Sequence, residues 1–192
     1  MMNNKGLLII LSAPSGCGKD TVFKALKQKR EDVVESVSAT TRKPRPGEVD
    51  GVNYFFLTED EFIEMIDNNG LIEYAQYNNN YYGTPTKGVN QAIEDGKICF
   101  LIIEVQGAQR VMKLYPDCVS IFLLPPSLEV LKKRLHGRET DSEEMINERL
   151  AISKVELGFK NKYTYNVVND DLDVCVNEIE KILDSELSKR NK

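Results

Sequence analysis

Apolar runs that do not alternate with polar residues recur along this chain. Residues 7–11, 98–103 and 119–124 are runs of this kind, and each precedes a segment with helical character. A strand that is buried on both faces of a parallel sheet shows this pattern, because neither face meets water. Short buried strands that alternate with helices predict an α/β fold around a parallel sheet. Residues 165–168 are a fourth, shorter candidate strand.

Two further stretches have patterns of their own. After the fourth candidate strand, apolar residues recur at spacings of three and four, namely Leu172, Cys175, Val176, Ile179, Ile182, Leu183 and Leu187. This stripe predicts a last helix that packs on the sheet. Between about residues 33 and 90, two short candidate strands flank Thr58, which precedes Glu61 by three positions and predicts a helix start with a capping box. We interpret this second stretch as an inserted, smaller subdomain.

Composition narrows the classes of protein. The chain has 192 residues, of which 41% are hydrophobic, and this is enough for one sizeable core. A net charge of -5 argues against a nucleic-acid-binding surface. Positive charge is instead concentrated where arginines gather, near residues 42–45, 134–138 and 149. Guanidinium groups bind phosphate oxygens in bidentate geometry, so this clustering indicates phosphate ligands.

The cysteines, the single histidine and the apolar runs indicate the cellular compartment and exclude some kinds of site. The cysteines are widely spaced and form no C-x-x-C pair, which favours reduced and mostly buried thiols. The single histidine, His136, argues against a histidine-ligated metal centre or a His-based triad. The apolar runs are too short to span a bilayer, and residues 12–14 interrupt the first one before a signal sequence could form. We therefore expect a cytoplasmic protein with no membrane partner.

A candidate phosphate-binding loop joins the first strand to the first helix. It comprises Ala13, Pro14, Ser15, Gly16, Cys17, Gly18, Lys19, Asp20 and Thr21. In this position backbone N–H groups and the helix N-terminus face the anion, and the lysine reaches the outer phosphates. The match to G-x-x-x-x-G-K-[S/T] is imperfect, since Ala13 replaces the first glycine and Asp20 the hydroxyl residue. An ordinary strand-turn-helix junction is the alternative.

Several motifs in a fixed order resemble those of guanylate kinases over nearly the whole chain. After the loop come residues 36–48, 52–56, 73–75, 80–84, 104–108, 125–127, 134–138 and 168–171. The resemblance implies a P-loop kinase fold with a parallel-sheet core, a small inserted nucleoside-monophosphate-binding subdomain and a helical lid. It implies a core at about residues 1–32, 95–127 and 160–192, a subdomain at 33–94 and a lid at 128–159. The implied activity is phosphorylation of GMP, and of dGMP, by ATP with Mg²⁺.

The same resemblance assigns the acceptor side of the site. It implies that Arg42 and Arg45, with Tyr54 and Tyr82, hold the GMP phosphate. Guanine would be recognised by Ser38, Glu73 and Thr84, and Glu104 also belongs to the GMP site. An ionised carboxylate can accept both N1–H and N2–H of guanine, whereas adenine offers an acceptor at N1. Without the resemblance, residues 42–45 could be a solvated basic turn and Glu73 one more exposed glutamate.

On the donor side, the resemblance implies that the loop and Lys19 bind ATP while lid arginines stabilise the charge on the transferred phosphoryl group. The implied catalytic residues are Lys19, Arg42, Arg134, Arg138 and Arg149. Asn169 matches a position near the adenine. Arg134 and Arg138 also line the ATP site, and the metal ligand would be Asp20 or Thr21. His136 is interpreted as an exposed spacer.

Three positions depart from the family pattern. Ile102 stands where an acid is usual, on the same strand face as Glu104. We hypothesise that Asp20 replaces this acid as a Mg²⁺ or Mg²⁺-water ligand, the alternative being that Asp20 caps the helix. Glu139 stands where glycine is usual, and we expect it to stiffen the lid. Cys17 would be redox-sensitive only if its thiol pKa were depressed.

Two other functions stay open at this point. A catalytically silent scaffold domain of the same fold would bind phosphorylated peptides in the GMP site. A related P-loop kinase would act on a ribosyl phosphate. Retention of Lys19 and the lid arginines favours the enzyme over the scaffold, and the set Ser38, Glu73 and Thr84 argues against the ribosyl phosphate. The sequence leaves a homo-oligomer open.

Overall fold

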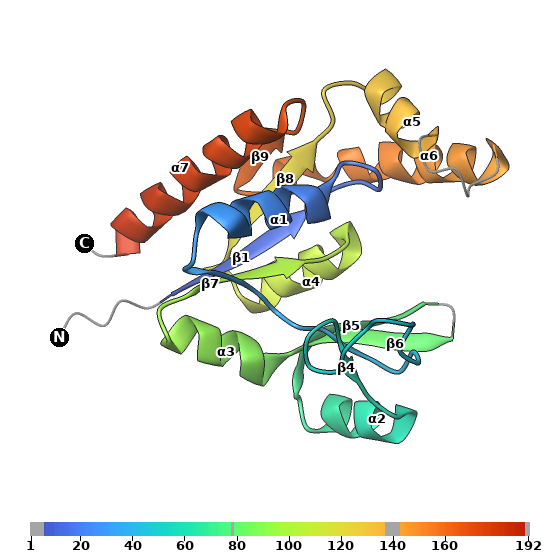
Figure 1. Cartoon of the computed structure of the whole chain (residues 1–192), viewed down its shortest axis with the longest axis vertical. Coiled ribbons are helices and arrows are strands. Elements are labelled where there is room, and N and C mark those ends of the chain that lie inside the picture. Colours follow the sequence, from blue (N-terminus) through green and yellow to red (C-terminus); the bar gives the residue numbers. More distant parts are fainter. Residues whose placement is uncertain (1–5, 78, 137–142, 191–192) are drawn as a thin grey trace.

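The structure is a computed structural model that describes residues 6–77, 79–136 and 143–190. Its core is a five-stranded parallel sheet in the order β2-β7-β1-β8-β9 (Figure 1). The strands are β1 Leu7–Ser12, β2 Val33–Glu35, β7 Ile98–Ile102, β8 Val119–Leu124 and β9 Tyr165–Val168. The predicted α/β fold with a parallel sheet is therefore confirmed.

The central strand β1 is buried on both faces, as its unbroken apolar run predicts. Leu7, Ile9 and Leu11 face one apolar cluster, and Leu8 and Ile10 face the other. The first cluster packs under α1 (Lys19–Lys29) and α7 (Leu172–Arg190), the second under α3 (Thr86–Glu94) and α4 (Val105–Leu114). Full burial of one such leucine or isoleucine contributes about 1.5–3 kcal/mol to stability. Helices thus cover both faces of the sheet.

A second sheet is inserted between β2 and α3, in the order β4-β3-β6-β5. Its strands are β3 Ala39–Thr40, β4 Phe55–Phe56, β5 Leu71–Tyr77 and β6 Asn80–Pro85, and it carries helix α2, Glu59–Asp67. The predicted capping box is present, because Glu61 Oε2 accepts a 2.7 Å bond from the Thr58 N–H while the Thr58 hydroxyl accepts one from the Glu61 N–H. In Figure 1 this sheet and α2 lie apart from the core layers.

The inserted subdomain was expected at about residues 33–94, but the elements at both ends of this range pack in the core. β2 pairs with β7 inside the core sheet, and Val33 is buried in the core. Helix α3 packs on β7 and β1. The insertion therefore occupies the chain between these two elements. A three-residue strand carries too short a pattern to be recognised from the sequence alone.

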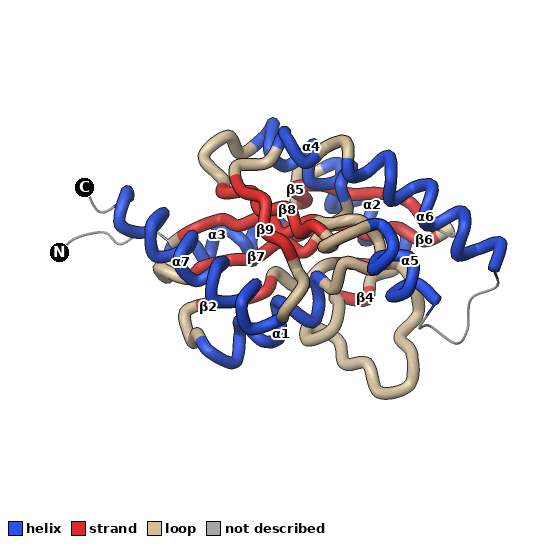
Figure 2. Tube along the Cα trace, turned by 90° about the horizontal axis from the view of Figure 1, so that it is seen from above, coloured by secondary structure: helices blue, strands red, loops and turns tan. Residues whose placement is uncertain are grey.

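Two helices project from one end of the core (Figure 1), and a short 3₁₀ turn leads from the second of them into β9. They are α5 Leu128–His136, α6 Glu143–Leu157 and η1 Lys160–Lys162, and Figures 1 and 2 show α5 and α6 beside each other at the end away from the chain termini. At the opposite end, Arg190 Nη1 donates a 3.1 Å bond to the Gly6 carbonyl. Among the residues that the structure describes, no helix is both long enough and apolar enough to traverse a lipid bilayer.

Candidate active site

The phosphate loop follows β1 and is closely packed. Gly16 and Gly18 adopt φ angles of 86° and 82°, a left-handed conformation that favours glycine. A Cβ on Gly16 would lie 2.9 Å from Leu135 Cδ2, so the loop touches the lid helix α5. Lys19 opens α1, and its Nζ donates a 3.3 Å bond to the Ala13 carbonyl across the loop. The ammonium group therefore already lies over the loop in which phosphates would sit.

Asn169 holds this loop from the side of β9. Its Nδ2 donates a 2.8 Å bond to the Cys17 carbonyl, and the side chain is buried. A Cβ on Gly18 would lie 2.9 Å from the same nitrogen, so the close approach requires glycine. The expected place of Asn169 near the adenine stays a prediction. The structure gives it a loop-supporting contact that the sequence did not suggest.

Cys17 does not have the property that a redox-sensitive thiol needs. Burial raises the pKa of its thiol to about 11, against the opposing charges of Lys19 and Arg134. A thiol with this pKa is almost wholly protonated near neutral pH. Of the four cysteines, Cys17, Cys99 and Cys175 are buried and Cys118 is half-buried, all as free thiols.

The second cationic group lies in the loop that follows β3 of the inserted sheet. Arg42 Nη2 donates a 2.8 Å bond to Glu48 Oε1, and Nη1 donates a 2.7 Å bond to the Lys43 carbonyl. The Arg42 guanidinium also lies 5.4 Å from the centre of the Tyr54 ring, which in turn meets the Tyr82 ring edge-on at 6.2 Å. The structure thus brings together three of the four residues expected at the GMP phosphate.

Arg45 joins this group through its backbone. Its N–H donates a 2.7 Å bond to Glu48 Oε2, while the residue itself is exposed. Glu48 therefore holds the Arg42 guanidinium and the Arg45 backbone from one carboxylate. The sequence analysis missed this role, although Glu48 stands only three positions after Arg45 and six after Arg42.

Two of the three expected guanine-binding residues meet across paired strands. Glu73 on β5 and Thr84 on β6 are register partners, and the Thr84 hydroxyl donates a 2.8 Å bond to Glu73 Oε1. Burial raises the pKa of Glu73, while this hydrogen bond and the charge of Arg110 act in the opposite direction. A Cβ on Gly107 would lie 3.3 Å from Glu73 Oε2, so the carboxylate rests against α4.

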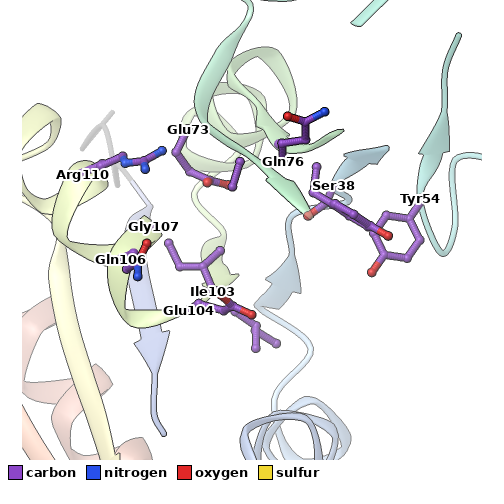
Figure 3. A pocket seen from close by; sticks show the side chains of 13 residues that line it. Ser38, Tyr54, Glu73, Gln76, Ile103, Glu104, Gln106, Gly107 and Arg110 are labelled. Atoms are coloured by element: carbon purple, nitrogen blue, oxygen red, sulfur yellow. The ribbon is translucent and has the colours of Figure 1, made fainter. Parts of the chain in front are cut away.

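A cavity of about 550 Å³ connects these groups. It is lined by Ser38, Tyr54, Glu73, Ala75, Gln76, Tyr82, Gly83, Ile102, Ile103, Glu104, Gln106, Gly107 and Arg110. Figure 3 shows the cavity between Ser38 and Tyr54 on one side and the start of α4, at Gln106 and Gly107, on the other. The volume is that of a small-molecule site. Five residues expected at GMP, namely Ser38, Tyr54, Glu73, Tyr82 and Glu104, line this one cavity.

One of the two candidate metal ligands, Asp20, lines a neighbouring pocket of about 320 Å³, and Thr21 does not. Asp20 and Thr21 are exposed in the first turn of α1, and Asp20 lines this pocket together with Ile102. Gly18 is the N-cap of α1, so Asp20 is not the capping residue. Glu35 lines the same pocket, and burial raises its pKa, with Asp20 acting in the same direction while the charges of Lys27 and Lys24 lower it. The sequence analysis missed Glu35 because it missed β2.

The lid brings further charges to the phosphate loop. Arg134 on α5 is half-buried and close enough to influence the Cys17 thiol, and Arg149 lies on α6. The Ser153 hydroxyl donates a 3.5 Å bond to the Ser15 carbonyl, which places α6 against the loop. Burial raises the pKa of Glu156, and contacts with Ser15 and Lys19 lower it.

One residue of the helices beside the loop was not predicted from the sequence, and two predicted lid residues lie outside the described part of the chain. Sequence reasoning missed Glu156, although it follows Arg149 by two helical turns and so shares its face of α6. Arg138 and Glu139 were expected to act in the lid, and both lie outside the described residues.

Comparison with known proteins gives consistent results. The family model described as guanylate kinase matches residues 5–186. A guanylate kinase from Halalkalibacterium halodurans is 48% identical over 100% of this chain and 94% of its own length. One from Lactococcus lactis is 50% identical over 96% of this chain and 90% of its own. The crystal structure of guanylate kinase from Anaplasma phagocytophilum aligns with a TM-score of 0.75 at 34% identity, covering 97% of this chain and 89% of that one.

Proposed function

This chain belongs to the guanylate kinase family, and from that premise we propose how its residues divide the work of the reaction. It phosphorylates GMP with ATP, as its relatives' identity supports. The assignment of individual residues rests mainly on one observation. The cavity that contains Glu73 also contains Tyr54 and Tyr82 of the Arg42 group, and it adjoins the pocket beside the first turn of α1.

We assign the acceptor nucleotide to this cavity. Arg42 and Arg45 bind the GMP phosphate with Tyr54 and Tyr82, because two guanidiniums can converge on one dianion. Glu73 accepts hydrogen bonds from N1–H and N2–H of guanine. We assign Ser38 to the guanine base as well, and Glu104, the N-cap of α4, to the acceptor side. Thr84 is buried and does not line the cavity, so we propose that it acts on guanine through its hydrogen bond to Glu73. Adenine presents an acceptor to the carboxylate at N1, so AMP is rejected.

The donor nucleotide is assigned to the phosphate loop. Residues 13–21 and Lys19 hold the phosphates of ATP, with Arg134, Arg138 and Arg149 around the transferred group and Asn169 behind the loop. An oxygen of the GMP phosphate attacks the γ-phosphorus, a new O–P bond forms, and the β–γ bridging bond breaks as ADP leaves. The protein contributes position, charge neutralisation and exclusion of water, since phosphoryl transfer requires little covalent help.

We propose that Mg²⁺ is the cofactor and that Asp20 or Thr21 holds it. The donors fit, because Mg²⁺ prefers oxygen ligands and one or two carboxylates suffice when phosphates and waters complete the shell. An ion held there would supply positive charge to offset that of the phosphate groups. Asp20, next to Ile102 in the pocket, supplies the carboxylate that Ile102 lacks, and Glu35 adds a second negative charge there.

The Mg²⁺ assignment is tested with Asp20→Ser alone and combined with Ile102→Glu. We expect the single change to raise the Mg²⁺ concentration required for half-maximal rate and the second change to restore it. Glu35→Gln serves as the matched loss of charge at the same pocket. An unchanged Mg²⁺ requirement in Asp20→Ser would show that Asp20 is not a ligand.

The substrate assignment is tested by a coupled assay with ATP and, separately, GMP, dGMP, AMP and a ribosyl phosphate. We expect turnover of GMP and dGMP and none of the other two. Turnover of the ribosyl phosphate would indicate the alternative kinase, and absence of any turnover would favour the phosphopeptide-binding scaffold. Since all substrates are small soluble nucleotides, we also propose that the enzyme acts in the cytoplasm, which cell fractionation can check.

A further inference from the structure

Arg110 links the core to the inserted sheet at the edge of the acceptor cavity. It lies on α4, which follows β7 of the core, whereas Tyr74 lies on β5 of the inserted sheet. Arg110 Nη1 donates a 2.7 Å hydrogen bond to the Tyr74 carbonyl. The two residues are 36 positions apart, so this bond joins elements that only the fold brings together.

The bond is formed next to Glu73. Fixing the Tyr74 carbonyl fixes the strand backbone that carries the Glu73 side chain. That carboxylate rests against Gly107, at which a Cβ would come within 3.3 Å of Oε2. Gly107 and Arg110 are three residues apart and so share one face of α4. In Figure 3 the Arg110 side chain extends from α4 toward Glu73.

We propose that Arg110 is a positioning residue for guanine selection, because its guanidinium fastens β5 to α4 beside Glu73 and holds that carboxylate toward the base. This inference rests on the proposed role of Glu73 in binding guanine. Arg110 itself acts through Glu73 and through the strand.

The charges around Glu73 predict a pH signature. Burial raises its pKa, and Glu104 at the start of α4 acts in the same direction. The Thr84 hydroxyl from β6 and the Arg110 charge from α4 lower it, and Tyr54 and Tyr82 line the same cavity. Without Arg110, the pKa of Glu73 rises further. Guanine requires the ionised form, so binding is lost as pH falls through this pKa, and the loss begins at a higher pH in the variant.

The test uses Arg110→Gln and Arg110→Lys, with Lys113→Gln as the control. Arg110 and Lys113 are both exposed residues of α4, so the changes should leave the fold intact. At pH 7 we expect the GMP KM of Arg110→Gln to rise about 5–20-fold, as for loss of a charge-assisted hydrogen bond. The kcat and the ATP KM should stay within about twofold, since Arg110 lies outside the proposed donor site.

The pH profile separates charge from geometry. In Arg110→Gln the acid limb of kcat/KM for GMP should move to higher pH. In Arg110→Lys the limb should stay in place while the KM is intermediate, because the ammonium keeps the charge but loses the planar fork. Lys113→Gln should match the wild type. A wild-type KM and acid limb in Arg110→Gln would overturn the proposal, and so would a fall in kcat without a change in GMP KM.

Comparison of GMP with IMP as substrates shows whether Arg110 positions the Glu73 carboxylate or only stabilises the local structure. IMP keeps N1–H but lacks the 2-amino group, so only GMP uses both bonds to Glu73. We expect Arg110→Gln to lower the GMP preference by about fivefold, the size of one weakened hydrogen bond. An equal loss for both substrates would indicate a merely structural role and overturn the proposal.

A parallel Glu73→Gln variant tests the guanine-binding role of Glu73 separately from the positioning role of Arg110. If Glu73→Gln leaves the GMP KM unchanged, the guanine-binding role of Glu73 is itself wrong, and the Arg110 proposal is wrong with it. If Glu73→Gln raises the KM but Arg110→Gln does not, only the proposal for Arg110 is wrong. In the Glu73→Gln background, Arg110→Gln should have little further effect, because coupled residues are not additive.

Discussion

Arg42 Nη2 lies 2.8 Å from Glu48 Oε1, and the other oxygen of the same carboxylate accepts the Arg45 N–H at 2.7 Å. One acid thus fixes the guanidinium of the first arginine and the backbone of the second. The Arg42 guanidinium also lies over the Tyr54 ring, 5.4 Å from its centre.

Glu48→Gln should therefore weaken GMP binding. The amide can still accept the Arg45 N–H but no longer holds Arg42 by charge. We expect the GMP KM to rise about three- to tenfold, in the range of one charge-assisted hydrogen bond, with little change in the ATP KM. Steady-state kinetics with each substrate varied in turn provides the measurement. A lower GMP KM would show instead that Glu48 competes with the phosphate.

Lys19→Met should abolish most activity without unfolding the protein. The Lys19 ammonium lies over the phosphate loop and donates a hydrogen bond to the Ala13 carbonyl. Loss of one preorganised cation at the transferred phosphate costs roughly 10²–10³ in kcat. The melting temperature should remain near that of the wild type. Retention of more than a tenth of the kcat would contradict the assignment.

Asn169→Ala should destabilise the protein and weaken ATP binding. It removes the 2.8 Å bond to the Cys17 carbonyl at a buried site, which costs about 1–3 kcal/mol. For a chain of this length each kcal/mol lowers the melting temperature by about 2–4 °C. Asn177→Ala, at an exposed asparagine bonded to Lys29, is the matched control and should change little. Equal melting temperatures for both variants would contradict the loop-supporting role.

Cys17 should resist alkylation in the folded protein. Its thiol pKa is raised to about 11, so at pH 7.5 the reactive thiolate is scarce, and the side chain is buried as well. We expect iodoacetamide to modify Cys17 far more slowly in the native protein than in urea, as followed by peptide mass spectrometry. Rapid labelling of Cys17 under native conditions would restore the possibility of a redox-sensitive loop.

The features that the sequence could predict are those encoded within a few neighbouring residues. The run at residues 7–11 predicted a buried strand, and Thr58 with Glu61 predicted a helix start; both are confirmed. The motifs that resemble a family added the nucleotide-binding residues. The tertiary contacts of these residues could not be predicted from the sequence, because the partners are far apart along the chain.

Three pairs illustrate that limit. Asn169 bonds to Cys17 across 152 positions, and Arg110 bonds to Tyr74 across 36. Gly16 meets Leu135 only because α5 folds over the loop. Some of these residues lie in motifs that the sequence shows, but a motif names no partner, so only the tertiary fold assigns one. β2 was not predicted because three residues are too few to show a hydrophobic period.

The position of strand β1 predicts which part of the protein unfolds last. It pairs with β7 on one side and β8 on the other, and all six of its residues are buried. Amide protons in such a strand exchange with deuterium mainly when the whole molecule opens. The strand that carries the phosphate loop should therefore be among the last parts of the molecule to lose its structure.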